Sequence, residues 1–128
     1  MCNVPLADEK KIVLVCDDSK CCLNAMKRAL QSKYHVITAS SGYEAVSFAH
    51  LYVPDIIIMD VMMYGMNGFE VVRKLQKQAV TRAIPVIFLS ALAEQKYIDE
   101  GQELGAVDYI TKPFDLAELI DKIEKHTR

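Results

Sequence analysis

The chain has 128 residues, of which 52% are hydrophobic and 25% are charged, so it has the size and composition of one folded domain rather than of a disordered or fibrous protein. Its formal net charge of −2 argues against a surface that attracts nucleic acid or an anionic membrane. The N-terminus lacks the pattern of an export signal, and no apolar run is long enough to span a membrane. We therefore expect a cytoplasmic protein without direct contacts to nucleic acid or membrane.

The four cysteines do not have the spacing of a metal site. They are Cys2, Cys16, Cys21 and Cys22, which form no CxxC pair. In a cytoplasmic protein such cysteines are expected to be reduced thiols.

Short apolar runs alternate with helical patterns along the whole chain. The apolar runs have the length of strands, and several of them are continuous, which is typical of strands buried on both faces. The predicted strands are residues 12–16, 36–39, 55–59, 85–89 and 107–110. The helical patterns between and after them begin near residues 20, 41, 69, 93 and 115. The sequence thus predicts five βα units.

Local signals support several of the predicted helix ends. Ser41 and Glu44 have the spacing of a capping box, and Asp115 is a suitable cap for the last helix. In that helix four apolar residues are predicted to face the core: Leu116, Leu119, Ile120 and Ile123. The helix predicted over residues 93–104 has a poor apolar stripe, so we expect it to be loosely held.

Strands that alternate with helices form a parallel sheet with helices on both faces, connected by right-handed crossovers. In this doubly wound α/β class, ligands bind beyond the carboxyl ends of the strands. Polar residues stand at those ends: Asp17 and Asp18 after the first strand, Asp60 after the third, Ser90 after the fourth and Lys112 after the fifth. We therefore expect these side chains to converge at one edge of the sheet.

Three carboxylates held together repel one another unless a cation lies among them. Oxygen ligands without histidine or cysteine favour a hard divalent ion, and Mg²⁺ suits a site of few carboxylates, water and phosphate oxygens. A carboxylate beside a metal, a lysine and a hydroxyl is well placed for phosphoryl transfer.

In order and position, these motifs resemble a response-regulator receiver domain of two-component signalling, of the chemotaxis type that stands alone as a single domain. The resemblance extends from Lys11 onward and is carried by Asp17-Asp18, by Asp60 and the segment after it, by Ser90-Ala91 and by Lys112-Pro113. It implies an N-terminal extension over residues 1–10 and a receiver domain over 11–128. The implied fold is flavodoxin-like, with five parallel strands in the order 2-1-3-4-5 and five helices.

The resemblance also implies a role for each site residue. Asp60 would be phosphorylated with the help of Ser90 and Lys112. Mg²⁺ would be held by Asp17, Asp18, Asp60 and the backbone carbonyl of Met62. Ser90 and Tyr109 would form a switch, in which Tyr109 turns inward after phosphorylation and remodels the face made by the fourth helix, fifth strand and fifth helix.

The implied partners are a histidine kinase or a histidine phosphotransfer protein as donor, and a downstream protein target or a fused output domain as receiver of the signal. Apart from its own phosphorylation and slow autodephosphorylation, the chain is expected not to be an enzyme. One residue departs from the family pattern: Tyr64 stands where a proline is usual, which leaves the loop after Asp60 freer.

Other interpretations of these residues remain open at this level. Asp17, Asp18 and Ser90 could act as helix caps. Lys112 could be an exposed charge next to an unusual backbone conformation, such as a cis peptide bond before Pro113. Tyr109 could be an aromatic residue on the surface. Two alternative functions are a phosphohydrolase and a flavodoxin-like electron carrier. A phosphohydrolase needs a second acid two residues after the nucleophile, and an electron carrier of this kind needs a phosphate-binding loop after the first strand. An unphosphorylated pseudo-receiver is the fourth possibility.

Overall fold

A computed structural model describes residues 10–128 of the chain. Cys2 and residues 1–9 of the predicted N-terminal extension lie outside the described residues. Cys16, Cys21 and Cys22 are free thiols. Among the residues described, no helix has the length and apolar character that crossing a membrane requires.

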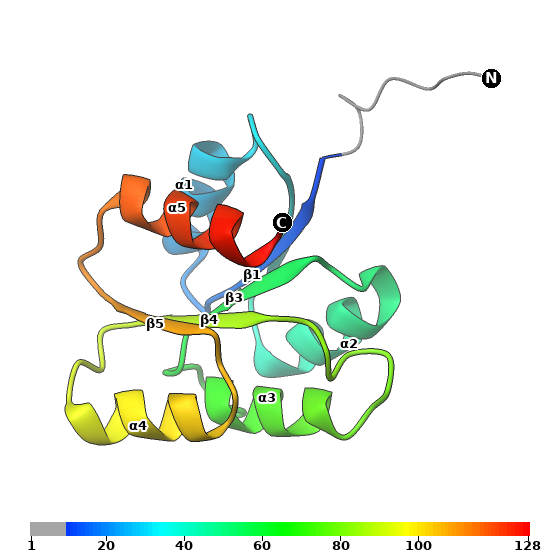
Figure 1. Ribbon diagram of the computed structural model, residues 1–128, viewed down its shortest axis with the longest axis vertical. Coiled ribbons are helices and arrows are strands. Elements are labelled where there is room, and N and C mark those ends of the chain that lie inside the picture. Colours follow the sequence, from blue (N-terminus) through cyan, green and yellow to red (C-terminus); the bar gives the residue numbers. More distant parts are fainter. Residues whose placement is uncertain (1–9) are drawn as a thin grey trace.

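Five parallel strands form one sheet in the centre of the molecule (Figure 1). Their order is β2-β1-β3-β4-β5, which confirms the expected doubly wound topology. The strands are β1 (Ile12–Cys16), β2 (His35–Ala39), β3 (Ile56–Met59), β4 (Val86–Ser90) and β5 (Asp108–Thr111). The order reverses between β1 and β3, because the chain leaves β1 toward one edge of the sheet and then returns to its other side.

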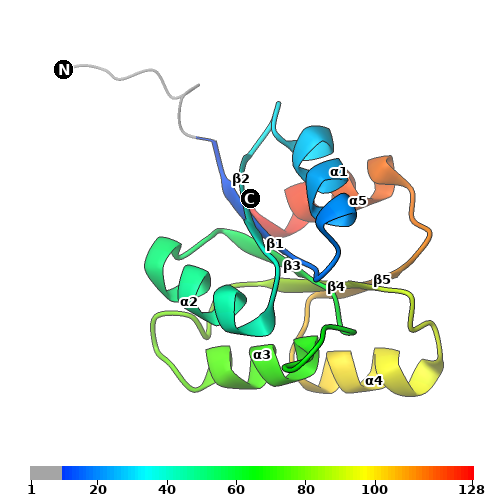
Figure 2. The same cartoon turned by 180° about the vertical axis from the view of Figure 1, so that it is seen from behind.

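Five helices cover the two faces of the sheet, α1 and α5 on one face and α2, α3 and α4 on the other (Figures 1 and 2). They are α1 (Lys20–Leu30), α2 (Gly42–Tyr52), α3 (Gly68–Gln76), α4 (Gln95–Glu103) and α5 (Leu116–His126). The predicted boundaries agree with these elements to within about two residues, which is the usual uncertainty at helix and strand ends.

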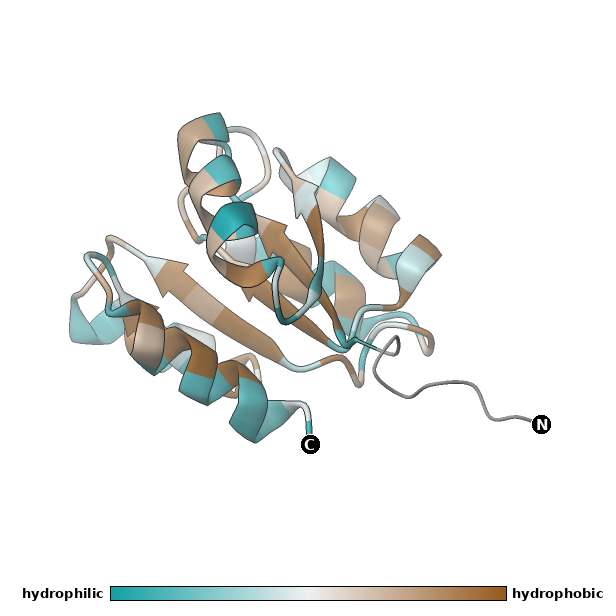
Figure 3. Cartoon of the chain, turned by 90° about the horizontal axis from the view of Figure 1, so that it is seen from above, coloured by the Kyte–Doolittle hydropathy of each residue, from teal (hydrophilic) through white to brown (hydrophobic). Residues whose placement is uncertain are grey.

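The core has two layers because successive side chains of a strand point to opposite faces of the sheet. In β1, Val13 and Val15 pack toward α1 and α5, whereas Leu14 and Cys16 pack toward α2 and α3, and all four are buried. The hydropathy colouring of Figure 3 shows the apolar strands enclosed between helices with hydrophilic outer surfaces. The continuous apolar runs in the sequence are therefore explained by burial on both faces.

Two details of the helix ends differ from the sequence prediction. The Ser41 hydroxyl accepts from the Glu44 N–H as expected, but the Glu44 carboxylate accepts from the N–H of Ser40 instead of Ser41. A complete capping box is formed by Asn67 and Glu70 at the start of α3, which the sequence analysis missed. It fixes the beginning of the helix that follows Asp60 along the chain.

The two helices on either side of β5 in the chain, α4 and α5, differ in how many of their residues are buried. In α5, Leu119 and Ile123 are fully buried and Ile120 is partly buried, but Leu116 is exposed, so its predicted inward orientation is wrong. In α4 only Gly101 is buried, and its first residue has no side-chain cap. The sparse burial agrees with the poor apolar stripe of α4, and its loose attachment stays a prediction.

Val53 ends α2 in a left-handed conformation, with φ 45° and ψ 65°. It is the one residue other than glycine with a positive φ in the described part of the chain. The conformation costs a β-branched residue free energy, because its Cβ crowds the backbone.

We predict that Val53→Gly raises the free energy of unfolding by about 1 kcal/mol, since relief of left-handed strain outweighs the extra entropy that glycine gives the unfolded chain. Urea unfolding measures the change. Val80→Gly is the matched control, because Val80 has nearly the same exposure (48% against 47%) without a positive φ, and it should lower stability. A loss of stability in Val53→Gly as large as in the control would contradict the prediction.

Candidate phosphoacceptor site

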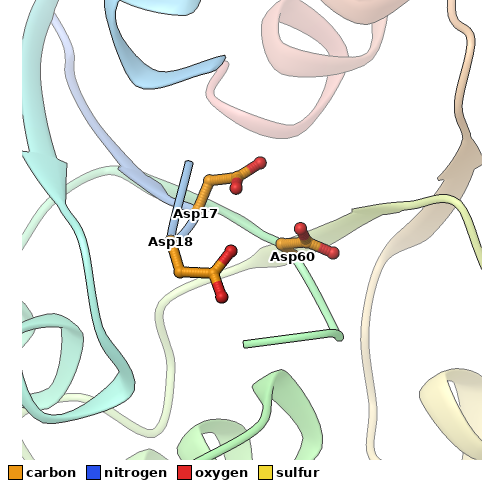
Figure 4. A group of neighbouring side chains, drawn as sticks. All are labelled: Asp17, Asp18 and Asp60. Carbon is orange, nitrogen blue, oxygen red and sulfur yellow. The ribbon is translucent and has the colours of Figure 1, made fainter. Parts of the chain in front are cut away.

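Three carboxylates meet at the carboxyl edge of the sheet, as the sequence analysis predicted. Asp17 and Asp18 follow β1, and Asp60 follows β3 (Figure 4). One carboxylate oxygen from each lies within 4.8 Å of the other two. In residues 10–128 this is the one group of three or more acids, histidines or cysteines close enough to hold a metal ion.

The sheet itself brings the acids together. β1 and β3 are adjacent parallel strands, with Cys16 opposite Met59, so the residues that follow them leave the sheet side by side. The ladder continues past the strand ends, where the Asp60 N–H donates to the Cys16 carbonyl at 2.9 Å and the Asp17 N–H donates to the Ala39 carbonyl at 3.1 Å. The acids therefore lie at the point where strand order reverses.

Lys112 lies between two of the three carboxylates. Its Nζ is 2.9 Å from Asp17 and 3.4 Å from Asp60. Burial opposes the charge on this lysine, but the bond to Asp17 and the nearby Asp60 carboxylate outweigh it, so the pKa of Lys112 lies above its ordinary value. One lysine offsets one of three negative charges, and a net charge of about −2 remains for a cation to neutralise.

Asp60 is almost completely buried, with 8% of its surface exposed. Burial raises its pKa, and the Asp17 carboxylate adds to the rise, while Lys112 and the Met62 N–H act in the opposite direction without cancelling it. Ionisation of Asp60 is thus less favourable than that of a free aspartate, and a further cation would favour it. This is the electrostatic condition expected of a carboxylate that becomes neutralised in use.

Gly68 allows α3 to begin directly against Asp60. A Cβ on Gly68 would overlap the backbone carbonyl oxygen of Asp60 and lie 3.0 Å from Cγ of Met59. The Gly68 N–H also donates to the Val61 carbonyl at 2.9 Å, which closes the β3–α3 loop. The close approach of Gly68 to Asp60 is visible only in the folded chain.

Ser90 and Lys112 occupy the predicted places at the ends of β4 and β5. Ser90 is completely buried, and its hydroxyl accepts from the Leu92 N–H at 3.2 Å. The Lys112-Pro113 peptide bond is cis, as the sequence suggested.

The Tyr109 side chain is directed inward, against the core layer that contains Phe88. Its hydroxyl donates to the Leu92 carbonyl at 2.6 Å, and its ring lies 6.0 Å from the ring of Phe88. Gly101 of α4 makes room for this position, since a Cβ there would lie 3.2 Å from the tyrosine ring. Partial burial raises the pKa of Tyr109, which keeps the hydroxyl protonated as a donor.

The β3–α3 loop covers one side of the acids with exposed side chains. The Met62 N–H donates to Asp60 at 3.2 Å, and the Tyr64 N–H donates to Asp18 at 3.1 Å. Both side chains are directed to solvent, and Tyr64 is 92% exposed.

Comparison with known proteins agrees with this geometry. Residues 13–124 match the response regulator receiver domain. The chain belongs to this family. It is therefore a receiver domain of two-component signalling, with the acidic pocket that is typical of phosphorylation in the family.

Three relatives show how this receiver domain compares with others. The chain is 40% identical to response regulator PleD of Caulobacter vibrioides over 91% of its length, but spans only 26% of PleD. The structure of chemotaxis protein CheY4 of Vibrio cholerae has a TM-score of 0.85, 32% identity, and coverage of 91% of this chain and 98% of that one. The receiver domain of sensor histidine kinase PA1611 of Pseudomonas aeruginosa PAO1 has a TM-score of 0.85, 28% identity, and coverage of 92% and 98%; its structure has a magnesium ion in the active-site cleft.

We predict that Asp60→Asn stabilises the protein at neutral pH in the absence of divalent cations. Because the pKa of Asp60 is raised on folding, its ionisation costs stability as pH rises from the ordinary aspartate pKa through the raised one. The gain should be full above that window and disappear below it. Urea unfolding in a chelator at several pH values measures it, with Asp121→Asn on the exposed surface of α5 as the control. A gain that is independent of pH would count against this explanation.

Proposed function

We propose that Asp60 accepts a phosphoryl group from the phosphohistidine of a histidine kinase or a histidine phosphotransfer protein. The observation that carries the proposal is the buried Asp60 carboxylate, which lies beside Lys112 and two further acids. A carboxylate oxygen of Asp60 attacks phosphorus, the bond from phosphorus to the donor nitrogen breaks, and the electron pair stays with the imidazole. Lys112 offsets negative charge on the transferred group.

The donor atoms present fit Mg²⁺, since they are oxygens without a nitrogen or sulfur among them. Asp17, Asp18, Asp60 and the backbone carbonyl of Met62 would hold the ion. When bound, Mg²⁺ would neutralise the excess negative charge and polarise the phosphoryl oxygens. The related PA1611 receiver domain, with magnesium in its cleft, supports this assignment.

The alternative of a phosphohydrolase lacks its general acid. Residue 62, two after Asp60, is a methionine, and its side chain is exposed. We therefore propose a phosphoacceptor whose chemistry is limited to its own phosphorylation and slow dephosphorylation. The downstream partner, which is a separate target or a fused output domain, stays a prediction. The cytoplasmic location and the domain boundary between residues 1–10 and 11–128 also stay predictions.

We predict that acetyl phosphate with Mg²⁺ adds one phosphoryl group to the parent chain and none to Asp60→Asn, because the asparagine amide is not a nucleophile for phosphorus. Intact-protein mass spectrometry at neutral pH measures the label. Asp121→Asn, the same substitution at a distant surface position, should be labelled like the parent. Equal labelling of Asp60→Asn would falsify the assignment, and an unlabelled parent would favour a pseudo-receiver.

We further propose that the phosphoryl group acts through Ser90 and Tyr109 on the surface formed by α4, β5 and α5. Ser90 would leave its bond with the Leu92 N–H and donate its hydroxyl to a phosphoryl oxygen. Leu92 also accepts the Tyr109 hydroxyl, so both switch residues are connected through one residue of the β4–α4 loop. Phosphorylation would stabilise the inward position of Tyr109, and the sparsely packed α4 is the element most able to move.

We predict that beryllofluoride, a phosphoryl mimic, shifts backbone amide resonances in α4 and β5 as well as around Asp60. In Ser90→Ala the shifts near Asp60 should persist while those in α4 and β5 decrease, because the hydroxyl that transmits the change is absent. Two-dimensional ¹H–¹⁵N NMR measures both regions. Shifts in the parent confined to the acidic pocket, or a Ser90→Ala pattern equal to the parent's, would contradict the proposed switch.

A further inference from the structure

The carboxylate of Asp18 is held differently from those of its two neighbours. Asp17 and Asp60 each accept a bond from a backbone N–H two residues later in the chain, and both contact Lys112. Within the described part of the chain, Asp18 has a single donor, the N–H of Tyr64, which is 46 residues away in sequence. The orientation of Asp18 therefore depends on the position of the β3–α3 loop.

That loop is fixed by its buried residues and not by Tyr64's ring. Val61, Met63 and Met66 are buried in the core layer on the α2 and α3 side. Gly65, directly after Tyr64, has φ 84°, a left-handed conformation that turns the chain toward α3. The Tyr64 side chain is in solvent, so the contribution of this residue to the site is its backbone N–H.

We infer that the backbone N–H of Tyr64 is a positioning group for the divalent-cation site, which orients Asp18 and connects the two loops that carry the proposed ligands. The inference rests on the proposed Mg²⁺ site. A carboxylate has lone pairs enough to accept an N–H and to bind a cation at the same time, so the bond is kept when the cation binds. Outer bonds of this kind orient metal-binding carboxylates, and their loss typically lowers metal affinity about 10- to 100-fold.

The identity of residue 64 decides whether this bond exists. Proline has no backbone N–H, so a chain with the proline that is usual at this position could not donate to Asp18. Any other residue retains the donor, whatever its side chain. Tyr64 thus gives this receiver an additional connection between the loop after β1 and the loop after β3.

The test is a Mg²⁺ titration without phosphodonor. The ¹H–¹⁵N NMR shifts of residues around Asp60 measure Mg²⁺ binding. Tyr64→Ala removes the ring and keeps the N–H, and Tyr64→Pro removes both. We expect the alanine variant to bind Mg²⁺ within about twofold of the parent and the proline variant about tenfold more weakly. In a protein that already carries Asp18→Ala, replacing Tyr64 by proline should cause no additional loss of Mg²⁺ affinity.

Proline also fixes φ, so a second variant separates the lost donor from a distorted loop. An ester in place of the peptide bond between residues 63 and 64, made by semisynthesis, removes the same N–H and leaves φ free, and it should weaken Mg²⁺ binding as proline does. Equal affinities of the proline and alanine variants, or parent affinity in the ester, would overturn the inference. If Mg²⁺ shifts no resonance near Asp60 in the parent, the proposed cation site is wrong and this inference with it.

Discussion

The mutual repulsion of three carboxylates is the constraint on which the rest of this receiver depends. The parallel sheet holds the residues after β1 and β3 side by side, so the backbones of Asp17 and Asp60 cannot separate without breaking the ladder. Lys112 reduces the repulsion but does not remove it; the pKa of Asp60 is raised mainly by burial, and the Asp17 carboxylate adds to the rise. A site with this imbalance gains free energy from a divalent cation and from neutralisation of Asp60.

The helices around the acceptor differ in how much of their surface is buried. On one side of the acids, α3 approaches so closely that only glycine fits at residue 68. On the β5 side, by contrast, α4 contributes one buried residue and has no side-chain cap. Local stability is low where few apolar contacts exist, so a change at the acidic pocket can be expressed there without disturbing the sheet.

Tyr109 lies between these two regions, with its ring directed inward against Phe88. Burial beside Phe88 and a hydrogen bond to the Leu92 carbonyl are sufficient to hold the ring. The phosphoryl group would then act by shifting a balance between states of similar free energy.

The sequence by itself determined the elements and the acid site. Apolar runs of strand length, such as Ile56 to Met59, can only be buried in a sheet covered on both faces, and a parallel sheet must gather the residues at its strand ends. Asp17, Asp18 and Asp60 could therefore be brought together from sequence alone. These conclusions depend on local periodicity and on one topological rule, and both are readable along the chain.

Only the tertiary structure decided the contacts between segments far apart in sequence. The exposure of Leu116, the inward ring of Tyr109 and the glycine-only space beside Asp60 depend on how closely helices approach the sheet, which apolar patterns do not specify. The bond from Tyr64 to Asp18 is the clearest case, since backbone N–H groups are the same in every residue except proline. The sequence shows only that residue 64 can donate, and the folded loop decides that Asp18 is the acceptor.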